Sequence, residues 1–202
     1  LYQYKYQRIF NYPSLAEGEA PRGSIGIPRV LNLYENYPFW HTFFTHLGYR
    51  VVLSPESNRK IYEKGMESIP SESVCYPAKL AHGHIQALLD QDVSLIFYPC
   101  IPYEEKEFDD VDNWYNCPIV MSYPETIKHN QDDVQKAGIT FLNPLLPFDN
   151  DQRLEERLAE IFGVYGINRL EITEAMDAAI AEKEAFCRDM EKKGEETIAY
   201  LK

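Results

Sequence analysis

The chain has 202 residues, of which 45% are hydrophobic and 26% are charged, and its formal net charge is −12. This composition predicts a folded globular protein and excludes an intrinsically disordered chain. The negative charge is not offset by a stripe of lysine or arginine, which argues against binding to nucleic acid or to an anionic membrane surface.

The sequence shows no sign of a membrane segment or of secretion. Its apolar runs are all shorter than the roughly 18 residues that a membrane-spanning helix needs, and no signal peptide opens it. Four cysteines without a secretion signal do not predict a disulfide framework, so we expect reduced thiols in a cytoplasmic protein. Because the first residue is Leu1, we expect the chain to be a piece of a longer protein.

The predicted elements begin after an N-terminal arm. Residues 1–22 are rich in tyrosine and form this arm, and Gly23 opens the folded domain. Short apolar runs predict strands, whereas longer stretches that follow a proline or repeat apolar residues at three- and four-residue steps predict helices. In the first half of the chain we expect strands over 24–31, 49–54 and 93–98, and helices over 38–47, 57–66 and 77–91.

The second half continues the alternation and ends in one long helix. Apolar residues recur from Ile172 to Leu201 at steps of three or four, which is typical of a helix packed against the domain. A coiled-coil partner is the alternative, and Gly194 weakens it. We expect strands over 118–122 and 139–142, and helices over 124–137, 150–163 and 167–202.

Short strands that alternate with helices predict an α/β fold. We expect a three-layer, Rossmann-like, doubly wound and mostly parallel sheet over 23–166, and a long C-terminal helix over 167–202 that leads toward a missing second domain. In such sheets, ligands bind in the crevice beyond the carboxyl ends of the strands. The functional site is therefore expected in that crevice, around Cys75 and Cys100.

Cys75 is the first candidate for chemistry. It stands two residues before Pro77, at the N-terminus of a predicted helix, where the helix dipole and unpaired N–H groups favour the thiolate. Lys79 and His82 follow near the same helix face, and we expect both to add positive potential beside the thiol. A thiolate at this position binds iron or zinc, or attacks an electrophile.

The other cysteines fall in different settings. Cys100 ends the most apolar strand and is expected at the same rim as Cys75, as a shared ligand or as a structural thiol, since their spacing matches no recognised zinc motif. Cys117 precedes the predicted strand over 118–122, which places it at the opposite rim unless the loop before it folds back. Cys187 lies in the long helix and is expected to pack there.

Two further groups of residues, and the absence of several known motifs, restrict the chemical functions that the sequence supports. His82 and His84 point to different faces of a helix, which argues against joint metal binding. The acidic run over 104–112 predicts a solvated loop and lacks the spacing of a calcium loop. The chain has no P-loop, no G-x-G-x-x-G, no G-x-S-x-G and no H-E-x-x-H, which disfavours ATP binding.

Four stretches together carry a resemblance that covers nearly the whole chain. They resemble a domain of large bacterial CoA-substrate-specific enzyme activases, the activators of 2-hydroxyglutaryl-CoA dehydratase, and are similar to the first Rossmann-like half of 2-hydroxyacyl-CoA dehydratase subunits. The stretches are RGSIGIPRVLNLYENYPFWHTFFTHLGYRVVLS, SIPSESVCYPAKLAHGHI, IFYPCIPYE and NCPIVMSYPE.

The resemblance implies an iron–sulfur cofactor. The dehydratase family holds a 4Fe–4S cluster through cysteines, and Cys75 and Cys100 match two of those positions. Cys117 has no match among them and is kept as a third candidate ligand, while Lys79, His82 and Tyr103 are candidates for contacts with the cofactor. The family also implies ATP-driven transfer of one electron for dehydration of a 2-hydroxyacyl-CoA.

The same resemblance implies partners within one polypeptide, and it leaves two alternatives open. The partners are an ATPase module and a second dehydratase-like half that supplies further cluster ligands, with an acyl-CoA as the possible substrate. One alternative is a non-catalytic scaffold that joins these modules and has structural thiols. The other is a module that binds CoA or another small molecule in the crevice through Asn32, Tyr34, Ser54 and Tyr103. The fragment alone is expected to be inactive.

Overall fold

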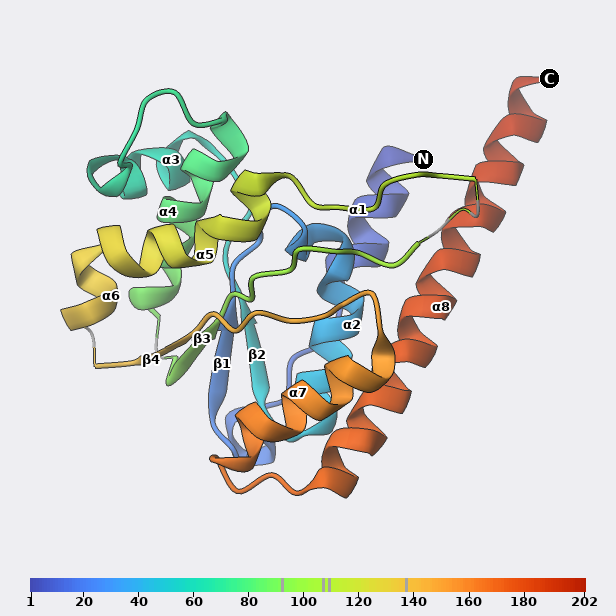
Figure 1. The fold of residues 1–202 in the computed structure, drawn as a ribbon. Helices are drawn as coiled ribbons and strands as arrows, with labels where there is room; N and C mark the ends of the chain where they lie inside the picture. Colours follow the sequence, from blue (N-terminus) through green and yellow to red (C-terminus); the bar gives the residue numbers. More distant parts are fainter. Residues whose placement is uncertain (92, 107, 109, 137) are drawn as a thin grey trace.

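The computed structural model describes residues 1–202 except 92, 107, 109 and 137. Within the described residues, one sheet of four parallel strands runs through the centre of the domain (Figure 1). The strand order is β2-β1-β3-β4, and the strands are β1 (Ser24–Ile27), β2 (Arg50–Leu53), β3 (Leu95–Phe97) and β4 (Thr140–Leu142).

Helices cover both faces of the sheet, which confirms the predicted three-layer α/β fold (Figure 1). None of the described helices combines the length and the apolar character that a membrane crossing requires. On one face lie α3 (Arg59–Gly65), α4 (Tyr76–Leu89), α5 (Pro118–Asn130) and α6 (Asp132–Lys136). On the other face lie α2 (Leu33–His46), α7 (Asp151–Gly163) and the long helix α8 (Arg169–Leu201), with α1 (Tyr2–Phe10) beside them.

An aromatic cluster fills the space between the sheet and α2. Trp40 and Phe44 of α2 contact Phe97 of β3 at ring-centroid distances of 4.7 and 4.9 Å. Phe43 and Phe44 also meet Phe162 of α7, and all five side chains are fully enclosed. Large aromatic side chains bury much apolar surface each, so this cluster fixes α2 and α7 onto the sheet.

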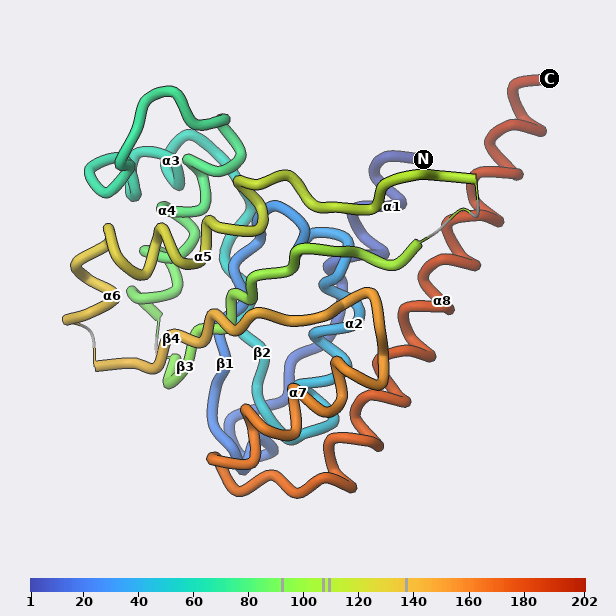
Figure 2. The backbone as a smooth tube through the Cα atoms, in the orientation of Figure 1, coloured from blue at the N-terminus to red at the C-terminus, as the bar shows by residue number. Residues whose placement is uncertain are grey.

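The N-terminal arm is not a free extension, because it contains helix α1 docked on the domain. Arg8 of α1 forms ion pairs with Glu182 and Asp189 of α8, each at 2.8 Å, and Ile9 is 2% exposed. Figure 2 traces both ends of the chain on the same side of the molecule. Helix α8 begins at an Asn168 capping box and packs its apolar stripe against α2.

Two predicted elements are wrong in the structure. The residues 118–122, expected as a strand, form the first turns of helix α5, where Pro118 occupies the first turn. Proline is favoured there because its missing N–H has no partner in a helix start. The helix expected to open at Pro38 begins earlier, at Leu33, and keeps Pro38 inside it.

The strand order changes direction between β1 and β3. After β1 the chain crosses to β2 on one side, and after β2 it crosses back to β3 on the other side of β1. A crevice for ligands forms at such a switch point, beyond the carboxyl ends of the two strands. In this chain the crevice lies beyond Ile27 and Phe97.

Candidate functional site

Cys75 stands at the N-terminus of a helix, as the sequence predicts. It is the N-cap residue of α4, Pro77 lies in the first turn, and the thiol side chain is exposed. Lys79 bends back toward the preceding loop, where its Nζ donates a hydrogen bond to the backbone oxygen of Glu72 at 2.6 Å. The lysine therefore holds the loop that leads into Cys75.

His82 does not add positive charge beside Cys75, so that expectation is wrong. The side chain is fully buried, and burial lowers the pKa of His82 to about 4, which leaves the ring neutral. The Ser68 hydroxyl donates to Gly65 O at 2.9 Å, so Nδ1–H of His82 donates to Ser68 Oγ at 2.8 Å. Its Nε2 is then the acceptor for the hydroxyl of Tyr123, at 3.0 Å.

Tyr123 links α5 to this buried histidine. The residue is 2% exposed, and burial raises the pKa of its hydroxyl to about 12, with a smaller contribution from the nearby thiol of Cys75. The hydrogen bond to His82 fixes the direction of the hydroxyl, so a neutral, oriented tyrosine joins α5 to α4.

Cys117 lies at the same kind of position as Cys75, and not at the start of a strand. It is the N-cap residue of α5, it is followed by Pro118, and its side chain is exposed. Helices α4 and α5 pack against each other, and Figure 1 shows their N-terminal ends on the same side of the molecule. The predicted placement of Cys117 at the opposite rim is therefore wrong, because residues 118–122 are helical.

Cys100 differs from both, because it is enclosed. It follows β3, pairs with Leu145 through an isolated parallel bridge, and is 6% exposed. Burial, together with the negative charge of Glu125 on α5, raises the pKa of the Cys100 thiol to about 11. The thiol is therefore protonated near neutral pH.

The three candidate cysteines do not form a complete cluster site within this chain. Among the described residues, no three His, Cys, Asp or Glu side chains are grouped so that they could hold a metal ion. Two of the thiols, Cys75 and Cys117, are exposed at helix N-termini, and Cys100 is buried and neutral. A 4Fe–4S cluster with all its protein ligands therefore does not fit the described residues alone.

We expect iodoacetamide to label Cys75 and Cys117 at pH 8 at least tenfold faster than Cys100. Thiolate is the reactive form, and Cys100 is both enclosed and shifted to a pKa of about 11. Mass spectrometry of peptides after timed alkylation measures the three rates. Labelling in denaturant is the control, and equal rates for all three cysteines in the folded chain would contradict the assignment.

A larger hollow lies at the switch point of the sheet. The cavity has a volume of about 860 Å³ and lies between the start of α2, the loop after β3 and the C-terminal half of α8. Asn32 and Tyr34, both predicted for the crevice, line it. None of the candidate metal ligands Cys75, Cys100 and Cys117 lines it, so the two candidate sites are separate.

The other two residues predicted for the crevice lie elsewhere. Ser54 is fully buried, and its Oγ accepts a hydrogen bond from the backbone N–H of Arg29 at 2.8 Å. Tyr103 pairs with Tyr115 across an antiparallel bridge, with ring centroids 4.6 Å apart, and does not line the cavity. Both expectations for these side chains are therefore wrong for this cavity.

Glu104 is a residue of this candidate site that the sequence did not reveal. Its carboxylate accepts hydrogen bonds from the side-chain amides of Asn32 at 3.2 Å, Asn36 at 3.1 Å and Asn116 at 2.8 Å. The sequence places Glu104 in an acidic run that reads as solvated loop. The available signal was that three of the four characteristic stretches each carry part of this cluster: NLYEN, IPYE and NCP.

The wall of the cavity also contains a backbone conformation that is uncommon for its residue type. Leu31 has a φ of +48°, in the left-handed region that side chains other than glycine rarely adopt. It lies between β1 and the start of α2, and it lines the cavity. The tight turn at Leu31 brings Asn32 and Asn36 toward Glu104.

A buried serine–histidine–serine chain resembles a nucleophile and its base, but it is closed to a substrate. Nδ1 of His84 lies 2.8 Å from Ser54 Oγ, and Nε2 lies 2.9 Å from Ser57 Oγ. Ser54 Oγ also accepts a hydrogen bond from the backbone N–H of Arg29, which ties the chain to the segment after β1. Ser54 and His84 are both fully buried, so we assign this cluster a structural role.

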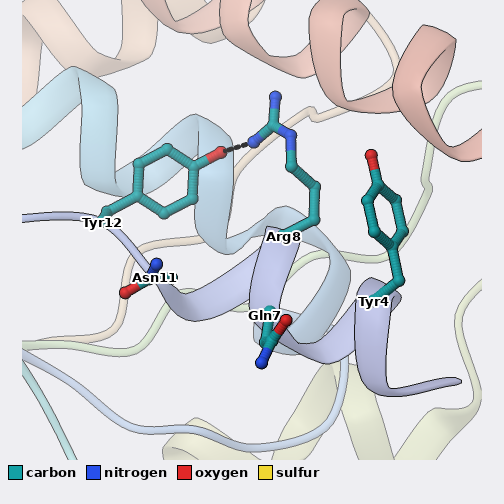
Figure 3. Close-up of a pocket in the computed structure, with 5 residues that line it drawn as sticks. All are labelled: Tyr4, Gln7, Arg8, Asn11 and Tyr12. Carbon is teal, nitrogen blue, oxygen red and sulfur yellow. Dashed lines mark hydrogen bonds between the residues drawn. The ribbon is translucent and has the colours of Figure 1, made fainter.

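A second, smaller hollow of about 240 Å³ lies along α1 (Figure 3). Arg8 and Tyr12 point toward each other there, with Tyr4 alongside. The guanidinium is already engaged by Glu182 and Asp189 as well as by Tyr12. The hollow therefore offers no uncompensated charge to a ligand.

Comparison with known proteins places the chain in a family. A family model described as the CoA enzyme activase uncharacterised domain matches residues 24–202. Comparisons with curated proteins and with solved structures found no match. The match covers the sheet, both helical layers and both candidate sites. The chain therefore belongs to the family of the CoA enzyme activase uncharacterised domain.

Proposed function

We propose that this domain presents Cys75 and Cys117 as ligands to a redox centre that other parts of a CoA enzyme activase polypeptide complete. The observation that carries the proposal is their common position: each is the exposed N-cap residue of a helix with proline in its first turn. The two helices pack against each other. Exposed thiols at helix N-termini are stabilised as thiolates and are accessible to a metal centre.

An iron–sulfur cluster is the centre that we propose for these thiolates. The ligand set is partial among the described residues, so in this proposal further ligands come from a second domain. Cys100 is buried, and burial raises the pKa of its thiol. It would join this set of ligands only if the binding of a partner exposed the thiol. The Tyr123 hydroxyl, which interacts electrostatically with Cys75, would help to tune such a centre, because groups that surround a ligand set its orientation and basicity.

The partners in this proposal are modules of the same polypeptide. The chain contains no P-loop, so an ATPase module would supply the energy for electron transfer. A second dehydratase-like half would supply the missing ligands, and an enzyme acting on an acyl-CoA would be the target, as the description of the family suggests. We propose that this assembly works in the cytoplasm, where the thiols stay reduced.

The test is iron and sulfide content after anaerobic reconstitution of the full-length polypeptide. We expect Cys75→Ser and Cys117→Ser each to lower bound iron by about half or more, because cluster binding needs every thiolate ligand. Cys187→Ser on α8 is the matched control and should retain the full content. Undiminished iron in the Cys75→Ser/Cys117→Ser double variant would overturn the proposal and leave the domain as a scaffold.

A further inference from the structure

The cavity at the switch point has an acidic anchor. Glu104 accepts hydrogen bonds from three asparagine amides, which come from α2 and from the segment just before α5. Within the described part of the chain, no lysine, arginine or histidine forms an ion pair with Glu104. A partly buried carboxylate is commonly paired with a cation, and among the described residues Glu104 has asparagine amides in place of one.

The charges around the cavity favour a cation over an anion. Among the residues that the structure describes, four glutamates and two lysines line it, which gives a formal surplus of two negative charges. Both lysines are already paired, Lys5 with Glu35 and Lys183 with Glu105. The surplus therefore remains at Glu104 and Glu191, and it would repel the phosphates of a coenzyme A.

The rest of the cavity lining is apolar and suits a ligand with a small apolar part. Tyr34 and Phe186 supply aromatic surface, and Leu31, Val120 and Met190 supply aliphatic surface. A volume of about 860 Å³ lies within the range of pockets that hold small molecules. One buried acceptor in the wall, Asn32 Oδ1, has no hydrogen-bond donor among the described residues, which again calls for a ligand that donates.

We infer that this cavity binds a small molecule with a primary ammonium group on an apolar body, and that Glu104 anchors the ammonium. The three asparagine amides hold the carboxylate in place, and the ammonium completes its set of hydrogen bonds. The inference does not depend on the thiolate proposal, because Cys75, Cys100 and Cys117 do not line the cavity.

The competing explanation is that Glu104 only clamps the loop after β3 to α2. A purely structural clamp would make the asparagine hydrogen bonds matter for stability but would give the cavity no preference between ligand charges. The two explanations therefore differ in charge selectivity in the unaltered chain and in the response of binding to Glu104→Gln. Glutamine keeps the shape and an accepting oxygen while it removes the charge.

The experiment is an NMR titration of the ¹⁵N-labelled chain with three probes of similar shape: 2-phenylethylamine, 2-phenylethanol and 3-phenylpropionate. We expect the amine to shift the backbone signals of Asn32, Glu104 and Asn116, and to bind at least tenfold more tightly than the carboxylate. Glu104→Gln should weaken amine binding at least tenfold. The control Glu67→Gln, at an exposed position in a turn after α3, should change it less than twofold.

Three results would overturn the inference. They are equal affinity for the amine and the carboxylate, amine binding that Glu104→Gln leaves unchanged, and no shift at millimolar amine. If Glu104→Gln fails to fold, the comparison of amine with carboxylate on the unaltered chain still decides the question. Urea unfolding of the Glu104→Gln chain separately measures how far the carboxylate acts as a clamp.

Discussion

Gly83→Ala is expected to lower the free energy of unfolding by about 3 kcal/mol or more, because the new methyl group has no space. A Cβ at this position would lie 1.7 Å from the backbone oxygen of Ile61 and 2.6 Å from its carbonyl carbon. Ile61 belongs to α3, so the clash is with a neighbouring helix backbone and not with a flexible side chain. The reciprocal contact is equally close, since a Cβ at Gly65 would lie 2.1 Å from Gly83 N.

The matched control is Gly194→Ala, which also places a methyl group inside a helix. No atom lies within 4 Å of that Cβ, and alanine favours helix over glycine by about 1 kcal/mol, so this variant should be slightly more stable. Urea unfolding followed by circular dichroism measures both. A Gly83→Ala chain as stable as the parent would show that α3 and α4 do not approach as closely as described.

Acidification from pH 7 to pH 4.5 is expected to destabilise the chain by several kcal/mol. Burial lowers the pKa values of His41, His82 and His84 to about 4 each, below the ordinary value of 6.5. As the pH falls below 6.5, these three histidines bind protons in the unfolded chain but stay neutral in the folded chain. The free energy of unfolding therefore declines toward pH 4. Each histidine contributes up to roughly 3 kcal/mol over that window, since one pKa unit corresponds to about 1.4 kcal/mol.

The measurement is a series of urea unfolding curves between pH 7 and pH 4.5. His84→Gln should reduce the slope of stability against pH by about 1.4 kcal/mol per unit at the acidic end, because one proton is lost from the linkage. His129→Gln is the control, since His129 lies on α5 with a side chain 69% exposed. Parallel slopes in the two variants would mean that His84 titrates normally in the folded chain.

The sequence predicts most of this fold because short apolar strands alternate with helices. It fails at residues 118–122, where a short apolar run with β-branched Ile119 and Val120 is as compatible with a strand as with a helix. What decides the outcome is tertiary: Tyr123 and Ile127 lie one turn apart and pack inward, and Tyr123 bonds to His82. That error also misplaced Cys117, because its predicted rim depended on the strand.

The position of a candidate site residue could be predicted only where it depends on residues close to it in the sequence. The N-cap position of Cys75 follows from Pro77 two residues on, and it is confirmed. Glu104 was missed because its partners Asn32 and Asn36 are far away in the chain, and an acidic run gives no sign of which carboxylate turns inward. The burial of His82 was missed for the same reason, since Ser68 and Tyr123 come from other elements.

The contact between α1 and α8 has a consequence for the order in which the chain is assembled. Arg8 bonds to Asp189, a partner 181 residues later in the sequence. During synthesis, helix α1 can meet α2 early, through Phe10 and Tyr37, but its ion pairs with α8 must wait until Asp189 has been made. Contacts of such long range form late, so the ion pairs with α8 complete the docking of α1 after its contacts with α2.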